Sequence, residues 1–168
     1  MLSAAIELTL FPGVMAFAAA SDFLTMRIAN RVSFVLLAGF AIVAILGSMT
    51  GVELVSHLGA GAAVLIAGFV CFARRWIGGG DAKLAAATAL WLGSGHLSEY
   101  LFYASEIGGV LTLLIMLFRT APLPTLIAGQ EWAERLHRYD AGVPYGIALA
   151  AAALIVYPQT DCMTRLGI

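Results

Sequence analysis

The segment Gly78-Gly79-Gly80-Asp81-Ala82-Lys83 places three glycines, a carboxylate and an ammonium group at the start of an apolar run. An ionisable residue at a membrane boundary is energetically costly and is therefore a functional candidate. The glycines lack Cβ atoms, so an extended peptide can approach closely and the chain can leave helical geometry ahead of Asp81. Taken alone, the segment also fits a flexible turn with an N-capping aspartate.

The composition around this segment is that of an integral membrane protein. Of the 168 residues, 61% are hydrophobic and 11% are charged, whereas about a quarter are charged in soluble proteins. The length fits a single domain over residues 1–168. The net charge of -1 argues against a nucleic-acid-binding role, which needs a basic face.

We predict an all-α fold, a polytopic membrane bundle of about six transmembrane helices, because uncharged apolar runs long enough to cross a bilayer form helices. The fourth run is the shortest and needs residues from the glycine segment to reach across. No sequence repeat supports an inverted-repeat transporter. The predicted spans are Leu2–Ala20, Val32–Met49, Leu58–Ala73, Leu84–His96, Leu101–Phe118 and Val143–Pro158.

The positive charges predict the orientation, since Lys and Arg in short loops favour the cytoplasm. Eight of the nine fall on one side of the predicted bundle, and Arg165 in the C-terminal tail is the exception. Both termini are therefore expected in the periplasm. The eight are Arg27, Arg31, Arg74, Arg75, Lys83, Arg119, Arg135 and Arg138.

Two other features bear on the loops. The segment between Arg119 and Gly142 is expected to contain an interfacial helix over Leu126–Arg138, because apolar and charged residues alternate there with helical spacing. The histidines are expected on opposite faces of the membrane, His57 and His96 outside and His137 inside, so no metal site is predicted.

A second carboxylate, Asp22, ends the first apolar run on the same side as Asp81. If the first and fourth helices touch, the two carboxyl groups can share a water molecule. A carboxylate takes the proton from that water while a carboxylic acid polarises a peptide carbonyl. Such a pair titrates as a unit. The helix N-terminus and Lys83 favour Asp81 as the base, and the helix C-terminus favours Asp22 as the acid.

Three motifs, taken in their order along the chain, resemble those of the type IV prepilin peptidases, which are Gly-x-Gly-Asp aspartic proteases. The motifs are Asp22 with Arg27-Ile28-Ala29-Asn30, then Gly78–Lys83, then Val143-Pro144-Tyr145-Gly146. The resemblance is closest to the short Flp or Tad form, which lacks a methyltransferase portion. It implies that Asp22 and Asp81 are catalytic. It also implies supporting or substrate-binding roles for Gly78, Gly79, Gly80, Lys83, Arg27, Asn30, Pro144, Tyr145 and Gly146.

Two details of the resemblance stay open. Where the family often has proline, this chain has Ala29, which should loosen the turn after Asp22 without removing a reacting group. The Val143–Gly146 motif can shape a substrate groove or simply start the last helix.

The resemblance implies a membrane aspartic endopeptidase of the bacterial inner membrane that cuts Flp-type prepilins and pseudopilins. The cut is expected after a glycine, on the cytoplasmic side, without metal or organic cofactor and without N-methylation of the product. Lipid and other pilus-assembly proteins are the further expected partners. Two alternatives are a small proton-coupled transporter, in which Asp22, Asp81 and Glu106 relay protons, and a non-catalytic assembly subunit that binds pilin helices.

Overall fold

A computed structural model of the protein describes residues 6–47, 49–160 and 163, and all regular structure in these ranges is helical. The all-α prediction is therefore confirmed. The elements are η1 (Ile6–Leu10, a π-helical turn), α2 (Phe11–Thr25), α3 (Asn30–Leu46), α4 (Gly51–Ala73), α5 (Gly79–Leu92), α6 (Leu97–Thr120), α7 (Glu131–His137), α8 (Gly146–Val156) and η2 (Tyr157–Gln159, a 3-10 turn).

Each predicted span corresponds to a helix, but several ends differ. Helix α2 continues past Ala20 to Thr25, so Asp22 lies inside the helix, and its carbonyl accepts the N–H of Met26 at 2.7 Å. Helix α5 begins at Gly79 instead of Leu84, because the glycine segment itself enters the helix. It ends at Leu92, before Gly93 turns the chain with a φ of 72°.

The number of membrane spans stays a prediction. In the part of the chain that the structure describes, three helices are long and apolar enough to cross a membrane: Ile6–Thr25, Gly51–Ala73 and Leu97–Thr120. Asn30–Leu46 and Gly146–Gln159 are shorter apolar helices. Helix α5 has 14 residues, so at 1.5 Å per residue it is about 21 Å long, less than the bilayer core of about 30 Å.

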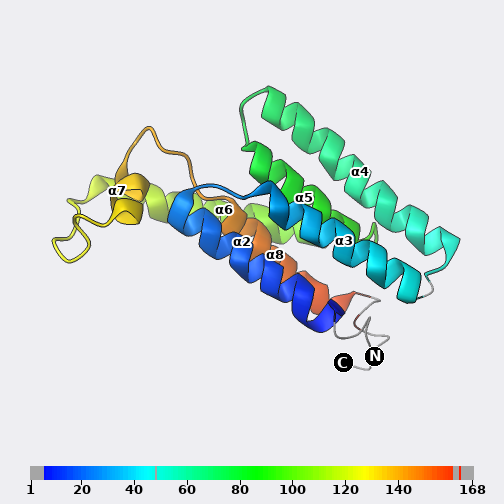
Figure 1. The fold of residues 1–168 in the computed structure, drawn as a ribbon. Coiled ribbons are helices and arrows are strands. Elements are labelled where there is room, and N and C mark those ends of the chain that lie inside the picture. The colour runs from blue at the N-terminus through cyan, green and yellow to red at the C-terminus, as the bar shows by residue number, and fades with distance from the viewer. Residues whose placement is uncertain (1–5, 48, 161–162, 164–168) are drawn as a thin grey trace.

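Helices α5 and α8 occupy the middle of the bundle (Figure 1). Helix α5 packs against α3, α4 and α8, and α8 also packs against α2 and α6. Trp91 of α5 is buried in this core, where its indole N–H donates to the Leu36 carbonyl at 2.9 Å and its ring lies 5.1 Å from that of Phe11. The core thus fixes α5, which carries Asp81, against α2, which carries Asp22.

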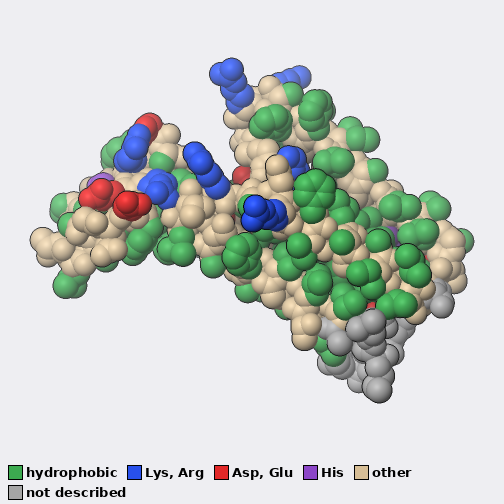
Figure 2. All heavy atoms as spheres, in the orientation of Figure 1, with side chains coloured by type: hydrophobic (Ala, Val, Ile, Leu, Met, Phe, Trp, Pro, Cys, Tyr) green, Lys and Arg blue, Asp and Glu red, His purple; other side chains and the backbone are tan. Residues whose placement is uncertain are grey.

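The loops that contain the basic residues lie at one end of the bundle. Helices α2, α4 and α6 end there, and α3, α5 and α8 begin there (Figure 1). Figure 2 shows the Lys and Arg side chains of the visible face gathered toward this end. At the opposite end, the Tyr157 hydroxyl donates to the Glu7 carbonyl at 3.0 Å. Arg165, the predicted exception, lies outside the described residues.

The prediction of an interfacial helix over Leu126–Arg138 is wrong in its bounds, because the observed helix is shorter. Helix α7 covers only Glu131–His137, and turns precede it. Gly129 adopts a φ of 89°, a left-handed conformation that a right-handed helix cannot contain. Leu126 therefore does not join an apolar helical face, and 94% of its surface is exposed.

Candidate active site

Asp22 is a buried carboxylate near the end of α2, with 4% of its surface exposed. Its Oδ2 atom accepts a hydrogen bond from the backbone N–H of Gly146 at 2.7 Å. A buried carboxylate is costly unless hydrogen bonds replace its lost water. The first residue of α8 therefore stabilises the carboxyl group on α2, a role of Gly146 that its sequence motif does not reveal.

Two glycines allow this close packing, and Ile28 lies against both. A Cβ atom on Gly146 would stand 2.6 Å from Ile28 Cδ1 and 2.8 Å from Asp22 Oδ2. A Cβ atom on Gly80 would stand 3.1 Å from Ile28 Cβ. The segment after α2 thus packs between the starts of α5 and α8. Ile28 has no role predicted from the sequence, because only the folded chain reveals this contact.

The glycine segment differs in part from expectation. Gly78 is extended, with φ of -70° and ψ of 146°, and forms the N-cap of α5, but Gly79 and Gly80 are already helical. None of the three has a positive φ. The Asp81 carboxylate turns back toward Gly78, where a Cβ atom would stand 2.8 Å from Asp81 Oδ2. Close approach, more than unusual backbone angles, therefore explains why glycine suits this segment.

Both carboxylates line one cavity of about 300 Å³. Its walls come from the end of α2, the segment that follows it and the start of α5. This cavity is large enough for several water molecules. It is lined by Asp22, Met26, Arg27, Ile28, Gly78, Gly79, Gly80 and Asp81.

Asp81 and Gly78 also line a second cavity, of about 690 Å³. The carboxylate of Asp81 thus stands where the two cavities meet. Most of its lining residues have no predicted role, because they come from the end of α4 and the loop after it, from the interior of α6 and from the segment before α8, and meet only in the fold. The cavity is lined by Phe72, Arg75, Trp76, Ile77, Gly78, Asp81, Thr112, Gly142, Val143 and Tyr145.

The last predicted motif contributes to both the cavity wall and the start of α8. Tyr145 lines the larger cavity, and its hydroxyl donates to the Ala104 carbonyl at 3.2 Å. Its ring lies against Gly108, where a Cβ atom would overlap the Tyr145 hydroxyl oxygen. Pro144 is fully buried, and Gly146 begins α8.

Three other predicted residues lie away from the two aspartate cavities. Lys83 Nζ donates to Asn30 Oδ1 at 2.9 Å and so connects α5 to α3. Both residues line an apolar groove between α3 and α4, which is separate from the two cavities that contain Asp81. Glu106 is exposed on α6 and lines neither of the aspartate cavities.

The arrangement suits proton transfer by two carboxyl groups. One carboxylate can accept a proton from a water molecule while the other, protonated, donates to a carbonyl oxygen. Because Oδ2 of Asp22 accepts the Gly146 N–H, a proton on Asp22 would be carried by Oδ1. The cavity leaves room for the water and for part of an extended peptide.

The model of the type IV leader peptidase family matches residues 9–113 of the chain. The match includes Asp22 and Asp81 but stops before Arg119 and Gly146. Searches of curated proteins and of solved structures find no match to the chain.

Proposed function

We propose that this chain, which belongs to the type IV leader peptidase family, is a membrane aspartic endopeptidase whose catalytic pair is Asp22 and Asp81. The observation that carries this proposal is the cavity of about 300 Å³, which both carboxylates line together with Gly78, Gly79 and Gly80. Leader peptide hydrolysis needs a proton acceptor, a proton donor and access for an extended backbone. The glycines provide that access, since no side chain stands between the substrate and α5.

In the proposed mechanism a water molecule lies between the two carboxyl groups. The water oxygen attacks the scissile carbonyl carbon while Asp81 takes a proton from the water. At the same time Asp22 donates a proton from Oδ1 to the carbonyl oxygen. This step gives a tetrahedral gem-diol intermediate. Asp81 then returns its proton to the leaving amine as the C–N bond breaks, and a gem-diol hydroxyl returns a proton to Asp22 as the new carboxylic acid forms.

We further propose that the substrates are Flp-type prepilins and pseudopilins, cut after the glycine that ends a positively charged leader. The cut would take place at the cytoplasmic face of the inner membrane. The clustering of the described basic residues at the end that holds Asp22 and Asp81 supports this side. Other pilus-assembly proteins are proposed to deliver the substrate.

Cleavage of a prepilin tests the function directly. Membranes that contain the protein are incubated with a Flp-type prepilin, and the products are identified by mass spectrometry. We expect one cut after the glycine, no cut with Asp81→Asn, and normal cutting with Glu131→Gln, which removes an exposed carboxylate of α7. If Asp81→Asn still cuts, or if the protein cuts no prepilin and instead moves protons, the proposal is wrong.

A further inference from the structure

Arg119 is a buried arginine at the end of α6 that hydrogen-bonds to three backbone carbonyls. Its Nε donates to Leu136 at 2.7 Å, and its Nη2 donates to Ala141 at 2.9 Å and to Gly142 at 2.8 Å. Only 9% of its surface is exposed. The guanidinium group offers its donors in a rigid plane, so it can hold several carbonyls in fixed positions.

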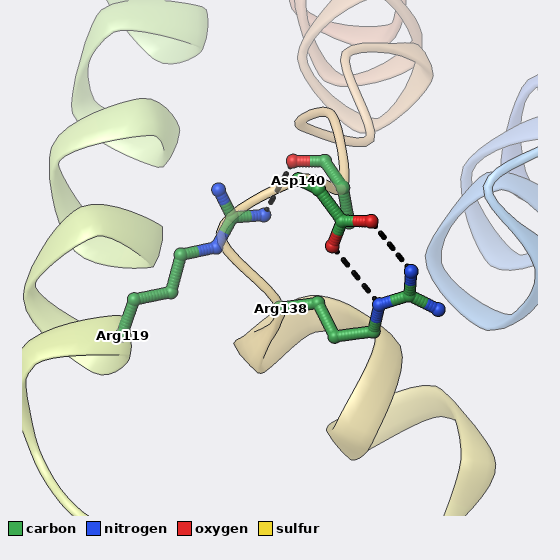
Figure 3. Close-up of polar contacts among 4 residues, drawn as sticks. Arg119, Arg138 and Asp140 are labelled. Carbon is green, nitrogen blue, oxygen red and sulfur yellow. Dashed lines mark hydrogen bonds and ion pairs between the residues drawn. The ribbon is translucent and has the colours of Figure 1, made fainter.

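No carboxylate pairs with Arg119 among the described residues. The nearby Asp140 side chain turns to Arg138 instead, as Figure 3 shows. The hydrogen bonds from Arg138 hold the pKa of Asp140 below its ordinary value, so Asp140 is the anionic partner of that exposed arginine. Burying a guanidinium group without a counter-ion is costly, and the three carbonyls are the compensation that the fold provides.

Two of the three carbonyls, those of Ala141 and Gly142, belong to the segment that leads from α7 into the candidate site, and the third belongs to α7 itself. Four residues after Gly142, the Gly146 N–H donates to Asp22. Such a link spans at most about 14 Å, and it is stiff, because Pro144 is fully buried and its ring fixes φ. A shift at Gly142 must therefore move Gly146 or distort the link.

The same segment forms part of the larger cavity. Gly142 and Val143 line it together with Asp81. A second arginine attaches α7, which precedes this segment, to α2, because Arg135 donates to the Leu24 carbonyl, near the end of α2, at 2.6 Å. The loop is therefore attached both to α6 and to the helix that carries Asp22.

We propose that Arg119 is a positioning residue for the peptidase reaction: by holding the Ala141 and Gly142 carbonyls it sets the place of the Gly146 N–H against Asp22. This inference rests on the proposed function for its catalytic consequence. Arg119 itself lines neither aspartate cavity, so it acts through the segment and not on the substrate.

The direct test observes the Gly146 amide by NMR. Tyr145-Gly146 is the chain's only Tyr-Gly pair, so carbonyl-¹³C tyrosine with ¹⁵N glycine isolates one amide signal. We expect Arg119→Met to move that proton resonance upfield, in the direction produced by Asp22→Asn. Arg119→Lys, which keeps the charge but loses the planar donors, should give a smaller shift. The matched control is Arg138→Met, which removes an exposed arginine from the same loop and should leave the signal in place.

The kinetic test separates positioning from substrate binding. Misplacement of a catalytic group by about 1 Å can cost roughly 100-fold in rate, so Arg119→Met should lower kcat by about that factor with KM unchanged. If Arg119→Met does not fold, Arg119→Lys carries both tests with smaller effects. An unmoved Gly146 amide in either folded variant would overturn the inference. Because the amide measurement needs no substrate, its result is independent of whether the proposed function is correct.

Discussion

Gly146 provides two features that no other amino acid can provide together at this position. Its N–H binds Asp22, and its missing Cβ leaves room for Asp22 and Ile28. Any side chain must push one of these neighbours away or move the start of α8. Even alanine, which adds a single methyl group to Gly146, should therefore disturb the position of Asp22 or Ile28.

We expect Gly146→Ala to reduce prepilin cleavage by about 100-fold, because it displaces the Asp22 carboxylate. Overpacking should also lower the free energy of unfolding by about 1–3 kcal/mol. The control is Gly109→Ala on α6, where a Cβ atom would meet nothing within 4 Å. That variant should cut normally and be more stable by about 0.5–1 kcal/mol. Equal cleavage by both variants would contradict this account of Gly146.

Ala29 occupies a backbone position whose geometry suits proline. It has a φ of -68° as the N-cap of α3, which is a conformation that proline prefers. Proline there should reduce the freedom of the unfolded chain, so Ala29→Pro should raise the free energy of unfolding by about 0.4–1 kcal/mol. Denaturant unfolding in detergent measures this. As a control, Ala85→Pro inside α5 should lower the free energy of unfolding by about 3 kcal/mol. A loss of stability with Ala29→Pro would refute the expected turn geometry.

The sequence singles out the carboxylates and glycines of the candidate site, but not the contacts that hold them in place. Asp22, Asp81 and the glycines beside Asp81 stand out because charge and glycine are rare in apolar runs. Arg119 does not stand out, since an arginine after an apolar run is expected in a solvated loop. Its burial depends on carbonyls 17 to 23 residues further along the chain, which no local pattern reveals.

At the scale of elements, α7 is too short to be stable alone. It is held by tertiary contacts: the Trp132 ring lies 5.2 Å from that of Phe23, and Leu136 is buried. The sequence correctly predicted a helix in this loop from the alternation of apolar and charged residues. It could not predict where the helix begins, because glycine is compatible both with a helix and with the positive φ that Gly129 adopts.

Truncation of Leu136 should release α7. Removing a buried leucine side chain costs about 2–5 kcal/mol, so Leu136→Ala should increase trypsin cleavage after Arg138 by at least about 30-fold. The control is Leu126→Ala, which truncates a side chain that is 94% exposed and should leave the rate unchanged. If both variants are cut at the same rate, α7 is not held by its buried face.

At the scale of the whole molecule, the order of helices places the basic loops at one end and the contact between Tyr157 and Glu7 at the other. The sequence predicted six helices in this alternating order from apolar runs and positive loops. It also marked the fourth run as the shortest, one that needs the glycine segment to reach across. Helix α5 does include Gly79 and Gly80 but ends at Leu92, earlier than predicted, because runs of small and apolar residues do not mark where a helix ends.

Cysteine labelling tests the orientation. In a background with Cys71→Ser and Cys162→Ser, we expect a membrane-impermeant maleimide added from the periplasm to label Gly95→Cys, which lies in an open turn between α5 and α6. The same reagent should label Leu126→Cys only after the inner membrane is permeabilised. The reverse pattern would place the aspartate cavities on the periplasmic side and refute the proposed orientation.

The central claim is that Asp22 and Asp81 act as one unit on a single water molecule. The most direct measurement compares prepilin cleavage by Asp22→Asn, Asp81→Asn and the double variant at equal folded amounts. General acid–base catalysis is worth about 10²–10⁴-fold, so each single variant should lose at least about 100-fold, and the double variant should be no slower than the singles. A single variant that cuts at the normal rate, or losses that multiply in the double variant, would contradict the claim.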